Sequence, residues 1–67
     1  MAMTASLTSR EREIADLISV GLSNREIARR LDLTEGTVKV HLHNIYRKTQ
    51  VRNRTALMAL MLGVSSL

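Results

Sequence analysis

Apolar residues recur at helical spacing in four segments of the chain, and polar positions flank each of them. In the first segment, Ile14, Leu17 and Ile18 follow the i, i+3, i+4 spacing that places side chains on one face of a helix. The other three stripes are Ile27, Ala28 and Leu31; Val38, Leu42, Ile45 and Thr49; and Leu57, Leu60, Met61 and Val64. This pattern predicts an all-α domain of four helices.

Capping residues mark the expected boundaries of these helices. A hydroxyl residue and a carboxylate three positions later form a capping box, in which each side chain satisfies a backbone N–H of the helix start. Two such boxes are present, Thr8 with Glu11 and Ser23 with Glu26. The remaining signals are the caps Thr34 and Asn53 and the helix-ending glycines Gly21 and Gly63. We expect the third helix over residues 35–49 and the fourth over residues 54–62.

The second and third predicted helices are joined by residues 31–34, which are too few for anything but a tight corner. Ala28 near the middle of the second helix would allow a close crossing, although alanine is also simply a good helix former. Asp32 stands in the corner, where many helix-turn-helix sequences have glycine, and aspartate tolerates the left-handed region. Residues 24–48 therefore predict a helix-turn-helix.

The third predicted helix has an apolar face and an opposite face that carries no carboxylate. The apolar sector, flanked by His41 and Tyr46, is expected to face the core. The opposite face and its shoulders comprise Gly36, Thr37, Lys39, Val40, His43, Asn44, Arg47 and Lys48. A branched apolar group such as Val40 among cations suits contact with a thymine methyl in a major groove, although a single exposed valine is common. Gly36 costs about 1 kcal/mol of helix propensity, which close approach to a phosphate backbone would justify.

The formal net charge is +4, and the positive charge is concentrated in the second half of the 67-residue chain. Five basic residues follow Glu35 without any acidic one: Lys39, Arg47, Lys48, Arg52 and Arg54. Such asymmetry suits a polyanion such as nucleic acid, although basic faces are also common on soluble helical proteins. The absence of cysteine fits a reduced cytosol, and the longest apolar run, residues 56–62, is far shorter than the roughly 18 residues of a membrane span. We expect a soluble, cytoplasmic domain without membrane contact.

No grouping of residues predicts an enzyme, a cofactor site or a metal site. The two histidines, His41 and His43, would diverge by about 160° on a helix and could not share a metal ion. The serines lie at caps and chain ends, and no nucleophile, base and orienting group come together. We expect a binding protein rather than an enzyme.

The last helix carries more apolar residues than one core-facing stripe requires. Met58 and Leu62 are expected on its far side, and this surplus predicts a second buried surface. The expected interface with a second copy comprises Thr55, Met58, Ala59 and Leu62. The alternative is that this helix packs against the remainder of a longer protein.

Four segments resemble the LuxR-type helix-turn-helix, the output domain of quorum-sensing regulators and of NarL/FixJ-type response regulators. They are residues 7–14 (LTSREREI), 21–28 (GLSNREIA), 37–41 (TVKVH) and 44–45 (NI). The resemblance extends from residue 7 to residue 63 with the motif spacing kept. It implies a four-helix LuxR-type domain whose third helix enters the major groove and whose fourth pairs two copies on dyad-related half-sites of double-stranded DNA.

The resemblance also implies roles for individual residues. Base-edge contacts are expected from Lys39, Val40 and His43. Phosphate contacts are expected from Asn24, Thr34, Thr37, Asn44 and Lys48, and the outward face of the third helix adds Arg47. The family further implies a bacterial, nucleoid-associated transcriptional regulator with an upstream receiver or ligand-binding domain. A helical protein-interaction module without DNA binding is the alternative function.

Thr49 departs from the family pattern, which usually has leucine at this position. If Thr49 is buried, we expect weaker packing between the third and fourth helices, by about 1 kcal/mol or more. The expected organisation is an expression start and disordered lead-in at residues 1–6, the DNA-binding domain at residues 7–64, and a C-terminal end at residues 65–67.

Overall fold

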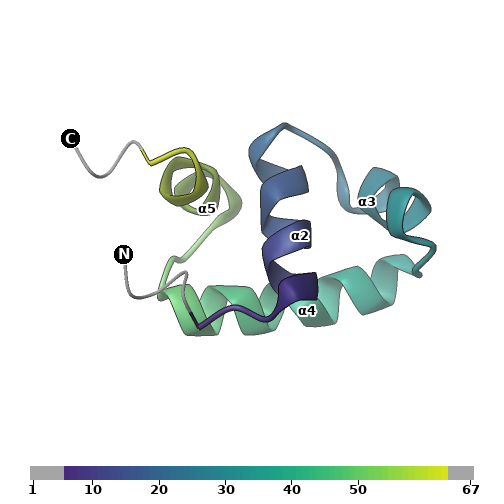
Figure 1. Cartoon of the computed structure of the whole chain (residues 1–67), viewed down its shortest axis with the longest axis horizontal. Coiled ribbons are helices and arrows are strands. Elements are labelled where there is room, and N and C mark those ends of the chain that lie inside the picture. Colours follow the sequence, from purple (N-terminus) through teal and green to yellow (C-terminus); the bar gives the residue numbers. More distant parts are fainter. Residues whose placement is uncertain (1–5, 64–67) are drawn as a thin grey trace.

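The computed structural model describes residues 6–63, and this part of the chain contains four helices and no strand (Figure 1). The helices are α2 (Ser9–Ser19), α3 (Asn24–Leu31), α4 (Glu35–Thr49) and α5 (Arg54–Met61). The predicted all-α class is confirmed, and α4 has the bounds expected from the sequence. The expectations for residues 1–5, for Val64 and for the C-terminal end at residues 65–67 concern positions outside the described residues.

Both predicted capping boxes are present. The Thr8 hydroxyl accepts a hydrogen bond from the Glu11 N–H at 3.1 Å, and the Glu11 carboxylate accepts one from the Thr8 N–H at 2.9 Å. The same pair of bonds joins Ser23 and Glu26, at 3.1 and 2.8 Å. The side chains of Thr34 and Asn53 also accept from the first turns of α4 and α5, as predicted. Local side-chain chemistry therefore sets all four helix starts.

Residues with positive φ follow each helix, and not all of them were predicted. Gly21 has φ 98° after α2, and Asp32 has φ 58° in the corner after α3, as the sequence indicated. Gln50 has φ 61° after α4, a left-handed position that the sequence did not reveal. The last helix ends at Met61, one residue earlier than expected, before Gly63 with φ 74°. These turns keep the connections short.

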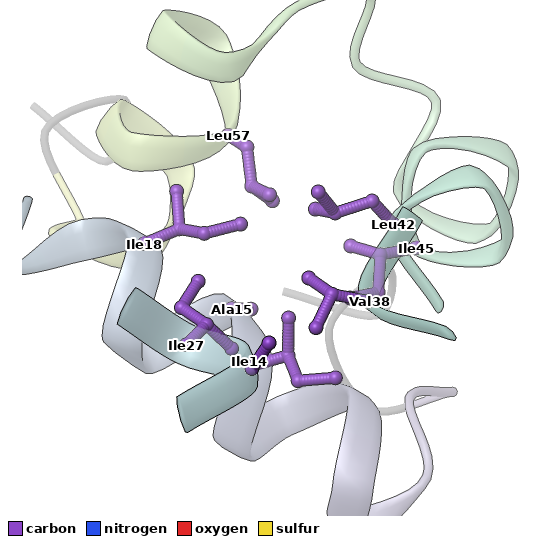
Figure 2. Packing of buried hydrophobic residues seen from close by; sticks show 9 residues of the cluster. Ile14, Ala15, Ile18, Ile27, Val38, Leu42, Ile45 and Leu57 are labelled. Carbon is purple, nitrogen blue, oxygen red and sulfur yellow. The ribbon is translucent and has the colours of Figure 1, made fainter. Parts of the chain in front are cut away.

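Side chains from all four helices form one hydrophobic core, and Figure 2 shows them pointing toward one another. The buried apolar residues are Ile14, Ala15, Ile18, Ile27, Ala28, Val38, Leu42, Ile45 and Leu57. Leu17, Leu31 and Met61 were expected in the inward stripes but are only half-buried, at the edge of this core. Leu60, expected in the same stripes, is also only half-buried. A domain of this size has few fully enclosed positions, so the stripes extend beyond the interior.

The arrangement of the helices centres on α2, which packs against both α5 and α4, while α3 packs mainly on α4 (Figure 1). Thr49 is only 1% exposed, and its hydroxyl donates to the Ile45 carbonyl at 2.7 Å. The predicted burial of Thr49 is therefore confirmed. Its hydroxyl is satisfied within α4, and α5 packs mainly on α2. The cost of having threonine at this position stays a prediction.

A partly buried ion pair joins the start of α2 to the end of α4. Lys48 Nζ lies 2.8 Å from Glu11 Oε1, and the side chain of Glu11 is only 6% exposed. The hydrogen bond from Lys48, together with the one from the Thr8 backbone, lowers the pKa of the Glu11 carboxyl although burial alone would raise it. No acidic residue follows Glu35 in the sequence, yet the fold brings Glu11 to Lys48.

We expect Glu11→Gln to destabilise the fold by about 1–3 kcal/mol, because the half-buried Lys48 ammonium would lose its carboxylate partner. Chemical denaturation followed by circular dichroism measures this change. Glu13→Gln is the matched control, since Glu13 loses the same charge from the same helix but has a side chain that is 52% exposed. Equal midpoints for the two variants would show that the ion pair contributes nothing.

The stability of the wild type should also fall on acidification. A carboxyl whose pKa is lowered by folding contributes stability that is present above its unfolded value, ordinarily 4.5, and is lost as the pH falls through the lower folded value. The stability of the Glu11→Gln variant should therefore depend less on pH than that of the wild type below about 4.5, the ordinary pKa of an unfolded glutamate. Some dependence should remain, because the hydrogen bond from the Ser23 backbone also lowers the pKa of Glu26.

Candidate nucleic-acid interface

The outward face of α4 presents the three residues expected to contact base edges. Val38, Leu42 and Ile45 are buried, which leaves Lys39, Val40 and His43 exposed on the other side of the helix. Val40 is 62% exposed, so nothing in the described part of the chain covers this apolar side chain. The face assignment made from helical periodicity is confirmed, and α4 offers a cation, an imidazole and a branched apolar group together.

The first turn of α4 is polar and accessible. The Thr34 hydroxyl accepts from the Thr37 N–H at 3.1 Å and lies 2.9 Å from the Thr37 hydroxyl, and both residues are exposed. A Cβ added at Gly36 would meet only the Thr34 hydroxyl, at 3.8 Å. The protein's own packing therefore does not require glycine at this position. Close approach of an external group to Gly36 stays a prediction from the sequence.

An open groove of about 310 Å³ lies beside this face and draws on three helices. Its lining consists of Asn24 from α3, Lys39, Leu42, His43 and Tyr46 from α4, and Arg54 from α5. The groove brings together three of the predicted site residues, Asn24, Lys39 and His43. None of its lining residues is acidic, so the local charge favours an anionic group.

Sequence reasoning missed two residues of this groove. Tyr46 was assigned to the flank of the core, and it is in fact half-buried with part of its surface in the groove. Arg54 was counted only as part of a basic segment. Its guanidinium donates to Asn24 Oδ1 at 2.7 Å and to the Leu22 carbonyl at 2.6 Å. Helical periodicity cannot predict this contact, because Arg54 and Asn24 are 30 residues apart in the chain. The position of Arg54 directly after the predicted cap Asn53 was the one local indication that its side chain lies near a helix start.

The other predicted phosphate contacts differ in accessibility. Arg47 is exposed, and Asn44 is half-buried. Lys48 has a side chain that is 25% exposed, and its ammonium is held by Glu11. The outward cationic surface is therefore smaller than the sequence indicated, because Lys48 is neutralised by a partner from α2. Arg47 and Lys39 remain as exposed cations of α4.

The expected pairing surface on α5 is less uniform than predicted. Thr55 is exposed and Leu62 is 61% exposed, whereas Met58 and Ala59 are half-buried. Met58 packs against the core cluster, so the expectation that it points away from the core is wrong. Among the apolar residues of α5 only Leu57 is buried, and the others are half-buried. Leu62, the C-cap residue directly after this helix, is a large apolar residue exposed to solvent.

The two histidines lie in different surroundings. His41 is half-buried, whereas His43 is exposed and lines the groove. Among residues 6–63, no cluster of three or more potential metal-ligating side chains occurs. No helix in the described part of the chain is long and apolar enough to cross a membrane.

A family model described as "Bacterial regulatory proteins, luxR family" matches residues 5–61, which include all four helices. The chain belongs to the LuxR family. The predicted resemblance is thereby confirmed. Because the members of this family are regulatory proteins, the prediction that the chain is not an enzyme is confirmed as well.

Relatives of this LuxR-family chain are bacterial transcriptional regulators. It is 51% identical over 57 residues to the monoamine regulon transcriptional regulator of Klebsiella aerogenes, and the aligned region covers 85% of the chain and 25% of that regulator. It is 52% identical over 52 residues to the CsgBAC operon transcriptional regulatory protein of Escherichia coli, and the aligned region covers 78% of the chain and 24% of that protein. It is 54% identical over 48 residues to the nitrate/nitrite response regulator protein NarL of Escherichia coli, and the aligned region covers 72% of the chain and 22% of NarL. The chain thus spans about a quarter of the length of these relatives.

We expect Lys39→Ala to weaken binding to duplex DNA by roughly 5- to 150-fold, because this exposed ammonium would lose its contact with a base edge or a phosphate. Fluorescence anisotropy with a labelled duplex measures the affinity. Arg12→Ala is the matched control, since it removes the same charge from an exposed position on α2 that does not line the groove. If Lys39→Ala and Arg12→Ala weaken DNA binding equally and only slightly, Lys39 does not belong to the interface.

Proposed function

We propose that this chain is the sequence-specific, double-stranded-DNA-binding part of a bacterial transcriptional regulator. The observation that carries the proposal is the outward face of α4, where Lys39, Val40 and His43 are exposed beside a groove without acidic residues. An exposed branched apolar side chain between two potential donors matches the mixed apolar and hydrogen-bonding edges of base pairs in the major groove. Membership of the LuxR family supports the same function.

In this proposal, α4 lies in the major groove of B-form DNA. Lys39 donates to guanine O6 or N7, Val40 contacts a thymine methyl, and His43 contacts a further base edge. The phosphates on either side are held by Asn24, Thr34, Thr37, Asn44, Arg47 and Lys48. Lys48 is the weakest of these contacts, because a phosphate would have to share its ammonium with Glu11.

We further propose that two copies pair through α5 on DNA with dyad-related half-sites. The exposed side chain of Leu62 supports this pairing, with Thr55, Met58 and Ala59 contributing around it. The half-site centres would lie roughly one helical turn, or about 10 bp, apart. Because the chain spans only about a quarter of its relatives' length, an upstream receiver or ligand-binding domain is part of the proposal. The regulator would act in the bacterial cytoplasm, on the nucleoid.

A helical protein-interaction module without DNA binding is the second candidate. The exposed Leu62 favours it, because a partner protein would cover this apolar side chain. It does not account for the exposed Lys39 and His43 beside a groove without carboxylates.

The proposal is tested by selection from a pool of random duplexes of about 24 bp, followed by titration of the selected DNA at two salt concentrations. We expect a recurrent motif to be enriched. We also expect its affinity to fall by roughly a hundredfold or more between about 50 and 200 mM salt, because phosphate contacts release counterions. A folded sample that binds no DNA at the lower salt concentration would favour the interaction module instead.

Pairing through α5 is tested with Leu62→Glu, which places a charge on the exposed apolar position without disturbing the core. We expect the fold and the affinity for a single half-site to be retained, while cooperative binding to a paired site is lost. Val20→Glu is the matched control, because Val20, the C-cap residue after α2, is 69% exposed. Unchanged cooperativity in Leu62→Glu would refute the assignment of this surface.

A further inference from the structure

Arg54 connects the start of α5 to the turn between α2 and α3. Its Nη1 atom donates to Asn24 Oδ1 at 2.7 Å, and its Nη2 atom donates to the Leu22 carbonyl at 2.6 Å. Two parallel donors of one planar group therefore hold a side chain and a backbone carbonyl of the same turn. The contact crosses from the first residue of α5 to the first residue of α3.

This contact determines which way the Asn24 carboxamide faces. Because arginine only donates, the carboxamide atom that faces Arg54 must be the acceptor oxygen. The amide nitrogen then points away from the guanidinium. Among residues 6–63, this nitrogen has no hydrogen-bond partner. Asn24 lines the groove together with Lys39 and His43, so two unused N–H donors are available beside the outward face of α4.

We propose that Arg54 is a positioning residue for DNA binding, which holds the Asn24 carboxamide so that its N–H groups donate to a backbone phosphate at the groove. The inference rests on the proposed DNA-binding function and adds to it a residue from α5. A free asparagine side chain would sample both orientations of its amide, and only one of them presents donors. Fixing the orientation before binding removes that entropic cost from association.

The geometry separates this role from a simple contribution of positive charge. A guanidinium can reach Asn24 Oδ1 and the Leu22 carbonyl at the same time, whereas the single ammonium of lysine lacks the planar fork. Arg54→Lys keeps the charge and Arg54→Gln removes it, yet both lose the double contact. If positioning is the function, the two variants weaken DNA binding to a similar extent.

The experiment is a double-mutant cycle in the 67-residue chain, with the duplex selected by the wild type as the probe. We expect Arg54→Gln, Arg54→Lys and Asn24→Ala each to weaken binding about five- to tenfold. The double variant Arg54→Gln/Asn24→Ala should bind no more weakly than Asn24→Ala alone, because Arg54 acts through Asn24. The dependence of affinity on salt should stay unchanged in Arg54→Lys and Asn24→Ala, since a neutral amide releases no counterion.

Asn24→Asp provides a test that does not depend on losing the contact. Aspartate keeps the acceptor for Arg54 and is favourable in the first turn of a helix, so the fold should be retained. It replaces the donating amide nitrogen by a carboxylate oxygen, and we expect DNA binding to fall by more than tenfold. Asn53→Asp is the matched control, because it makes the same change at the exposed cap of α5, where the Ala56 N–H still has its acceptor.

Several outcomes would overturn the inference. Wild-type affinity in folded Arg54→Lys, or equal losses for Asn24→Asp and Asn53→Asp, would show that the orientation of Asn24 does not matter. Additive losses in the cycle, with a salt slope reduced by about one in Arg54→Gln, would show that Arg54 binds a phosphate itself. If the wild type selects and binds no DNA, the proposed function fails first. If it binds and the Arg54 variants bind equally well, only the role of Arg54 fails.

Discussion

Burial of the apolar stripe of α4 fixes the rotation of this helix about its own axis, and the exposed face depends on that rotation. Val38 and Ile45 are 0% exposed and Leu42 is 5% exposed, in contact with core residues from the other helices. A turn by one residue position, about 100°, would bring these side chains into water and move polar groups toward the core. The exposure of Lys39 and Val40 is therefore a consequence of hydrophobic packing on the opposite side of the helix.

Two polar contacts between distant segments complete this framework. Glu11 caps α2 and also pairs with Lys48 at the end of α4, so one carboxylate serves a helix start and a tertiary contact. Arg54 in the same way ties α5 to the turn before α3. A domain with a small core has a thin margin of stability, and such shared roles make a few side chains important both for the fold and for the groove.

The last helix shows how a small domain limits the surface that it leaves for partners. Met58 contributes to the edge of the core, and Leu62 stays 61% exposed at the end of α5. Met58 therefore offers less of its surface to a second copy or to another part of a longer protein than the sequence pattern indicated. Thr55, Met58 and Ala59 lie on the same helix as Arg54, and Leu62 directly follows it, so the residues proposed for pairing and for positioning Asn24 belong to one short segment.

The sequence by itself determined the four helices, the caps at their N-terminal ends, the corner at Asp32 and the outward face of α4. These features depend on interactions within a few residues and on the helical period, which a single chain reveals directly. Only the tertiary structure decided that Lys48 meets Glu11, that Arg54 holds Asn24 and that Met58 turns inward. Those pairs are separated by many positions in the chain, or depend on which side of a short helix meets α2. The packing of the four helices brings them together, and that packing leaves no periodic signal in the sequence.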